Sequence, residues 1–114
     1  MPINSKNKGK RGELELSHIL NEKYGYHTER TAQYCGKAKD SEADLRGIDG
    51  MHIEAKFREK HNVYDYIAQV NRDKKDGDIG VVFMKSNRKD ILCLLTLDDF
   101  MKVWKGYEKD VKEM

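Results

Sequence analysis

The stretch that decides the fold runs Asp44-Leu-Arg-Gly-Ile-Asp-Gly-Met-His-Ile-Glu54-Ala-Lys56, an acidic residue followed by a candidate hairpin and a Glu-x-Lys triplet. Side chains alternate between the two faces of a strand, so Glu54 and Lys56 project from the same face. A carboxylate and an ammonium held side by side suit phosphodiester hydrolysis, which needs an anchored divalent cation and an oriented water. The triplet therefore indicates a metal-dependent phosphodiesterase site.

Two hairpin registers fit this stretch. A two-residue turn at residues 49–50 would place Leu45 opposite Glu54 and mix apolar and charged side chains on both faces. A three-residue loop over residues 48–50, with its final glycine in the left-handed conformation, instead pairs Asp44 with Glu54. We expect the second register because it separates the two kinds of side chain. The charged face then carries Asp44, Glu54 and Lys56, and the apolar face carries Leu45 and Ile53.

Length and composition predict one soluble domain over residues 1–114, with residues 1–8 as a flexible basic tail. Charged residues make up 37% of the chain and hydrophobic residues 38%, so much of the surface must be charged. No apolar run approaches the length of a membrane span, and the first residues lack the apolar core of a signal peptide. Membrane and secreted classes are therefore not expected.

Basic residues gather ahead of the acidic cluster, although the formal net charge is only +2. Residues 1–12 and 30–39 contain several lysines and arginines, and this pattern fits contact with phosphate. The polar loop over residues 32–42 adds an amide and an aromatic ring that could stack on a base. An ordinary solvated tail and an exposed loop would look the same. The candidate DNA contacts are Lys8, Lys10, Arg11, Arg30, Gln33, Tyr34, Lys37 and Lys39.

Two cysteines, Cys35 and Cys93, lie far apart in the sequence. Neither has a second cysteine or a histidine at the spacing of a zinc finger, so we expect no zinc site. Reduced thiols are the simplest reading, and they favour a cytoplasmic protein.

Hydrophobic periodicity and turn residues divide the chain into eight elements in the order αβββαββα. The predicted helices cover residues 9–24, 63–75 and 97–109, and the predicted strands cover residues 26–31, 44–46, 51–56, 79–84 and 91–97. Glu13 shares a helix face with the apolar residues of the first helix. It either reaches the metal site or occupies a favourable position in the first turn. Gln69 is a possible accessory residue beside the apolar stripe of the second helix, and Trp104 is expected in core or dimer packing.

Taken together, Lys8-Gly9-Lys10-Arg11-Gly12-Glu13 opening a helix, Ala43-Asp44-Leu45 and Ile53-Glu54-Ala55-Lys56 resemble the PD-(D/E)XK nuclease superfamily. The pattern is similar to that of archaeal-type Holliday junction resolvases and phage endonucleases over residues 8–84. This resemblance implies an α/β restriction-endonuclease-like core, in which helices flank a mixed sheet of about five strands. Alanine stands at position 43 where the motif has proline, and this exchange removes no catalytic group.

The resemblance also implies roles for the site residues. Asp44 and Glu54 would ligate Mg²⁺ or Mn²⁺ with the Ala55 carbonyl, and Glu13 would join the same cluster as a further possible ligand. Lys56 would position or deprotonate the attacking water, or stabilise the developing charge. The catalytic set is therefore Glu13, Asp44, Glu54 and Lys56.

The implied function is a structure-selective DNA endonuclease, first of all a Holliday junction resolvase that acts as a homodimer in a bacterial or phage-infected cell. Two alternatives stay open. One is a sequence-specific or nicking DNA endonuclease of the same superfamily. The other is a noncatalytic nucleic-acid-binding domain with the same fold.

Overall fold

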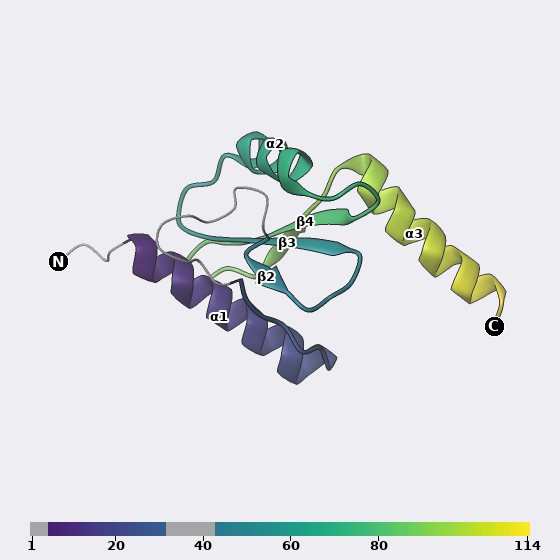
Figure 1. Ribbon diagram of the computed structural model, residues 1–114, viewed down its shortest axis with the longest axis horizontal. Helices are drawn as coiled ribbons and strands as arrows, with labels where there is room; N and C mark the ends of the chain where they lie inside the picture. Colours follow the sequence, from purple (N-terminus) through teal and green to yellow (C-terminus); the bar gives the residue numbers. More distant parts are fainter. Residues whose placement is uncertain (1–4, 32–42) are drawn as a thin grey trace.

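The computed structural model describes residues 5–31 and 43–114, and for residues 5–8 the backbone alone. Its elements follow the predicted order (Figure 1). They are α1 (Ser5–Tyr24), β1 (Glu29–Arg30), β2 (Leu45–Arg46), β3 (Met51–Phe57), α2 (Val63–Asp73), β4 (Ile79–Lys85), β5 (Leu92–Leu94) and α3 (Leu97–Lys112). The five strands form one sheet in the order β1-β2-β3-β4-β5. β3 and β4 are parallel and joined by α2, whereas the other neighbours are antiparallel.

The hairpin between β2 and β3 has the three-residue register. Leu45 pairs with Ile53, and the Met51 N–H donates to the Ile48 carbonyl across the loop. Gly50 closes the loop in the left-handed conformation, with φ of 84°. The prediction from the two-faced pattern is therefore confirmed.

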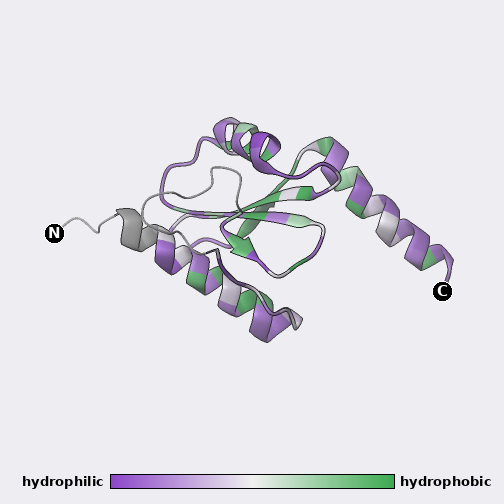
Figure 2. Ribbon diagram, in the orientation of Figure 1, coloured by the Kyte–Doolittle hydropathy of each residue, from purple (hydrophilic) through white to green (hydrophobic). Residues whose placement is uncertain are grey.

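Two cores lie on opposite faces of the sheet, and the green central strands of Figure 2 belong to both. On one face α1 packs on the odd-numbered residues of β3 and β4, and this core contains Leu16, Leu20, Leu45, Ile53, Val81 and Phe83. On the other face α2 covers the even-numbered residues, and this smaller core contains Tyr66, Val70 and Val82. Because Glu54 pairs with Val82, it projects from the face that α2 covers.

The helix α1 begins at Ser5, so its backbone includes part of the segment expected to be a tail, and residues 1–4 lie outside the described chain. It ends at Tyr24, the end that the sequence predicted. The Gly25 N–H donates to the Asn21 carbonyl, and the Tyr26 N–H donates to the Leu20 carbonyl. Gly25 has φ of 79°, which a glycine adopts without strain at a helix end.

The first strand is shorter than the predicted 26–31 because α1 takes the hydrogen bonds of the segment before it. The Thr28 N–H donates to Asn21 Oδ1 at 2.7 Å, and Asn21 Nδ2 donates back to the Thr28 carbonyl at 3.0 Å. A backbone group already satisfied by a side chain cannot join a sheet ladder. The predicted strand over 91–97 is also too long, since its last residues cap and begin α3.

The last helix is anchored at its root and projects from the domain (Figure 1). Thr96 is its N-cap and accepts from the Asp99 N–H. The buried Asp99 accepts from the Gly80 N–H at 3.0 Å and from Lys74 Nζ at 3.2 Å. Every residue from 100 to 114 is exposed, so Trp104 does not pack in the core of the described chain. No helix among the described residues is long and apolar enough to cross a membrane.

Candidate active site

Asp44 stands at the sheet edge where β2 begins. Its N–H donates to the Ile53 carbonyl at 2.9 Å, and its carboxylate Oδ2 accepts from the Ala55 N–H at 2.8 Å. The side chain thus takes the backbone donor that a further residue of β2 would otherwise satisfy. The N–H and C=O of a strand residue point to the same side, so the Ala55 carbonyl also faces this edge.

Glu54 lies in the middle of β3 and is only 1% exposed. Its Oε1 lies 2.9 Å from Nε2 of the buried His52, which shares its face of the strand. Sequence reasoning missed this histidine, although the two-residue spacing that linked Glu54 to Lys56 also links it to His52. The contact with His52 fixes one of the two carboxylate oxygens of Glu54.

Glu13 approaches the same place from α1, with a side chain that is 14% exposed and an ion pair to Arg30 Nε at 2.6 Å. The helix comes this close to β3 because residue 12 is glycine. A Cβ on Gly12 would lie 2.7 Å from Phe57 Cβ, so any larger residue would push α1 away. The structure thus places the Asp44 and Glu54 carboxyl groups within hydrogen-bond reach of each other, and Glu13 near enough for its charge to act on Asp44.

The crowding of these acids changes the protonation of Asp44. Burial raises the pKa of Asp44 to about 8, helped by the charge of Glu54, a hydrogen bond with that carboxyl group and the charge of Glu13. The Ala55 N–H opposes the shift but does not cancel it. At neutral pH the repulsion is therefore relieved by a proton on Asp44, and a bound cation would take the place of that proton.

The oxygen ligands of this site suit magnesium better than zinc, and better than an ion that must be enclosed by protein side chains on all sides. In the described part of the chain no three His, Cys, Asp or Glu side chains form a ready metal-binding cluster. Magnesium keeps several waters and uses one or two carboxylates with substrate phosphate, so it does not require such a cage. Two carboxylates beside an edge-facing carbonyl therefore fit this ion.

Lys56 lies at the end of β3 and is half-buried. Its Nζ sits 5.4 Å from the ring centroid of Tyr66, which α2 holds over it, and no ion pair joins it to a described carboxylate. Beside it is a hollow of about 430 Å³, lined by Lys56, Arg58, Lys60, His61, Asn62, Asp65, Tyr66 and Gln69. Lys56 is thus a cation that forms no ion pair with a described carboxylate, and it lies next to a basic hollow that Gln69 also lines.

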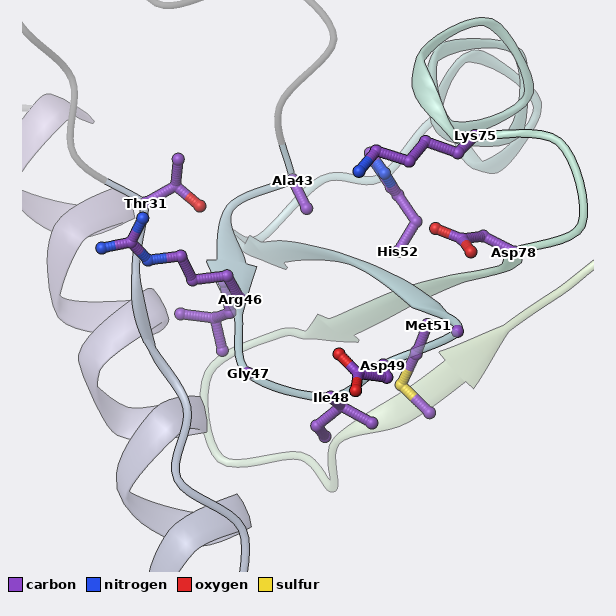
Figure 3. Close-up of a pocket in the computed structure, with 12 residues that line it drawn as sticks. Thr31, Ala43, Arg46, Gly47, Ile48, Asp49, Met51, His52, Lys75 and Asp78 are labelled. Atoms are coloured by element: carbon purple, nitrogen blue, oxygen red, sulfur yellow. The ribbon is translucent and has the colours of Figure 1, made fainter.

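A second hollow of about 490 Å³ lies at the hairpin end of the sheet (Figure 3). His52 lines it together with Lys75 and Asp78, but none of the three clustered acids does. Although it is the larger hollow, it meets the acidic cluster only through His52. Asp44, Glu54 and Lys56 therefore lie next to this hollow, farther along β3 from the hairpin.

The candidate DNA contacts fall into three groups. Lys10 and Arg11 are exposed on α1, three and two residues before Glu13. Arg30 is bound to Glu13, so its charge is already partly used within the domain. The side chain of Lys8 and the loop residues Gln33, Tyr34, Lys37 and Lys39 lie outside the described part.

Comparisons with known proteins bear on the family and the fold of this chain. Residues 4–114 match the model of a family described as "Phage putative PDDEXK endonuclease". The fold is similar to that of Hjc, a Holliday junction resolvase of Archaeoglobus fulgidus, with a TM-score of 0.58 and 23% identity over 76% of each chain. At this identity the likeness establishes the fold, which is the expected α/β architecture with a five-stranded mixed sheet. Among proteins of curated function, none matches the sequence. The family match covers nearly the whole chain, and the chain therefore belongs to the phage PDDEXK endonuclease family.

Proposed function

We propose that this protein is a Mg²⁺-dependent DNA endonuclease, and specifically a resolvase of four-way junctions. The observation that carries the proposal is the convergence of Glu13, Asp44 and Glu54, with the pKa of Asp44 raised by burial and by its acidic neighbours. A carboxylate in a simple ion pair has a lowered pKa, whereas Asp44 keeps a proton that a divalent cation could displace.

Asp44, Glu54 and the Ala55 carbonyl would hold the ion, Mg²⁺ or Mn²⁺, and Glu13 would add to the negative field or ligate directly. When bound, the metal supplies Lewis acidity at the scissile phosphate and lowers the pKa of water. Asp44 would lose its proton as the cation binds, since a nearby positive charge reverses the effect of the acidic neighbours. His52 would keep Glu54 in one orientation through its ring nitrogen.

Lys56 would act on the attacking water and on the phosphate. Its ammonium lies over the Tyr66 ring and beside the basic hollow, where a phosphate oxygen would find a cation without a competing carboxylate. The water oxygen would form the new bond to phosphorus and release its proton to solvent, as the bond from phosphorus to the 3′-oxygen breaks. The 3′-oxygen would leave and take up a proton, giving 5′-phosphate and 3′-hydroxyl ends.

The branched substrate is a separate part of the proposal. It is supported by the fold that the chain shares with a junction resolvase and by exposed basic residues on α1 ahead of the site. Two symmetric nicks across a four-way junction require two active sites, so we expect the working form to be a homodimer.

The test is a cleavage panel on four-way junction, flap, linear duplex and single strand, each in Mg²⁺ and in Mn²⁺. Glu54→Ala and Lys56→Ala should each lose cleavage by several orders of magnitude while still binding the junction. Asp49→Ala is the matched control, because Asp49 is an exposed acid on the same hairpin and lies outside the proposed ligand set. It should cut like the wild type.

Each other outcome of the panel has a defined meaning. Undiminished cutting by Glu54→Ala or Lys56→Ala would refute the site. Equal cutting of linear duplex and junction would replace the resolvase by a sequence-specific or nicking endonuclease. Junction binding without cleavage in either metal would leave a noncatalytic DNA-binding domain.

A further inference from the structure

The projecting helix α3 carries an apolar stripe that nothing in the described chain covers. Its two central rings, Trp104 and Tyr107, are 45% and 59% exposed. The rings also form a row, since Phe100 stacks on Trp104 at 6.5 Å between centroids and Trp104 lies 5.4 Å from Tyr107. The full stripe is Leu97, Phe100, Trp104, Tyr107, Val111 and Met114. Its residues are spaced alternately three and four apart, which places them on one helix face.

A lone helix of this kind is poorly stabilised. α3 has 16 residues, close to the length at which isolated helices are marginal in water, and Gly106 in its interior costs about 1 kcal/mol relative to alanine. Helices in proteins gain most of their stability by packing an amphipathic face. Here the face is amphipathic but unpacked beyond the first turn.

The first turn of α3 holds the stripe in a fixed direction. Asp99 is buried and bound to both Gly80 and Lys74, so the helix cannot swing freely at its base. A preoriented helix loses less conformational entropy when it pairs than a mobile segment would. The stripe is therefore suited to docking.

We propose that α3 pairs antiparallel with α3 of a second copy of this chain. The spacing of the stripe reads the same from both ends, so a two-fold axis between Lys105 and Gly106 brings Trp104 beside Tyr107 of the partner subunit. The same axis brings Phe100 beside Val111 of the partner subunit. A surface that matches itself in this way is the requirement of an isologous dimer.

Area and charge both favour this occupant. Three rings, each about half exposed, leave on the order of 300 Å² of aromatic surface, and the whole stripe leaves on the order of 600 Å². This approaches the roughly 800 Å² per partner of a standard interface. Charge argues against DNA, because the four acids of α3 match its four lysines: Asp98, Asp99, Glu108 and Asp110 against Lys102, Lys105, Lys109 and Lys112. A phosphate-binding surface would carry an excess of lysine or arginine.

The inference does not depend on catalysis, because association can be measured without DNA or metal. The single tryptophan of the chain lies in the centre of the stripe, so its emission reports on this surface alone. The experiment is to follow molar mass by ultracentrifugation and tryptophan emission together, over a dilution series of the full chain across the micromolar range.

We expect twice the monomer mass at the high end and a red shift of emission as the mass falls on dilution. Tyr107→Glu should give a monomer with red-shifted emission at every concentration, while circular dichroism and thermal unfolding show a folded domain. Lys109→Glu is the matched control, since residue 109 lies on the opposite side of α3, and it should dimerise like the wild type.

Three results would overturn the proposal. They are a wild-type monomer at the highest concentration, a dimer that Tyr107→Glu leaves intact, or a mass change without a change in emission. If the dimer forms but no DNA is cut, the catalytic proposal fails and this one stands. If a wild-type monomer cuts DNA, this proposal fails and the catalytic proposal stands.

Discussion

Replacing Asp44 by asparagine should make the metal-free protein more stable while removing its response to Mg²⁺. Asparagine keeps an oxygen for the Ala55 N–H and gains an amide that can donate to Glu54, so the local contacts survive. What changes is the charge. The substitution thus separates the electrostatic cost of the site from its packing.

The magnitude follows from the pKa of Asp44. Burial and the neighbouring acids raise this pKa from 3.8 to about 8 in the folded protein. Between these values the folded state holds a proton that the unfolded state has released, so the free energy of unfolding falls as pH rises. At pH 7 the loss is at most about 4 kcal/mol, because each unit of pKa is worth about 1.4 kcal/mol and the site can relax. Asp44→Asn should recover part of this loss.

Urea denaturation in EDTA at pH 4, 5.5, 7 and 8.5 tests the prediction. The variant should gain stability over the wild type as pH rises and match it near pH 4. Mg²⁺ should stabilise the wild type and leave the variant unchanged. Asp49→Asn, an exposed acid on the same hairpin, should follow the wild type at every pH. Asp44→Asn equal to or less stable than the wild type at pH 8.5 in EDTA would refute the electrostatic reasoning.

Three further predictions concern the surroundings of the site. In urea denaturation Gly12→Ala should lose about 1–3 kcal/mol of stability, because the new Cβ overpacks against Phe57. Gly9→Ala is the matched control: its Cβ would have nothing within 4 Å, so this variant should gain up to about 1 kcal/mol. Asp99→Ala should cost about 2–3 kcal/mol at neutral pH. Burial opposes ionisation of Asp99, but its hydrogen bonds to the Gly80 backbone and to Lys74 outweigh this effect and lower its pKa. The stability difference between the wild type and Asp99→Ala should therefore shrink below about pH 4. A difference that stays constant in acid would contradict this. His52→Leu should weaken Mn²⁺ binding about 10–100-fold, as measured by calorimetry. His52→Gln retains a hydrogen-bond donor and should restore most of the affinity. Equal Mn²⁺ affinities of the wild type and His52→Leu would exclude a positioning role for His52.

The sequence was sufficient for the central hairpin because two independent patterns agree there. The alternation of apolar and charged residues allows one register, and a glycine sits where that register needs a left-handed residue. The grouping of Glu13, Asp44 and Glu54 followed from the family resemblance. Helix periodicity alone left Glu13 undecided, since a first-turn acid needs no partner in the site.

Other features depend on contacts between distant parts of the chain. The first strand is short because Asn21 takes the backbone bonds of Thr28, and strand propensity carries no information about such competition. The Asp44 carboxylate meets the Ala55 N–H because β2 begins only at the next residue. The amphipathic pattern of α3 was visible, but a pattern does not tell whether its apolar face meets the same chain or another.

The two-residue pairing of β1 with β2 has a consequence for the local stability of the site. Glu54 and Lys56 belong to β3, which pairs along its full length with β4, whereas Asp44 is held by one of the smallest ladders in the sheet. Local opening draws first on segments with few protected amides and little buried contact. Asp44 can therefore move away from Glu54 without global unfolding, and a ligand that bridges these two residues would stabilise β2 against this local opening. Hydrogen exchange would register such a ligand at β2 before it registered anywhere in β3 and β4.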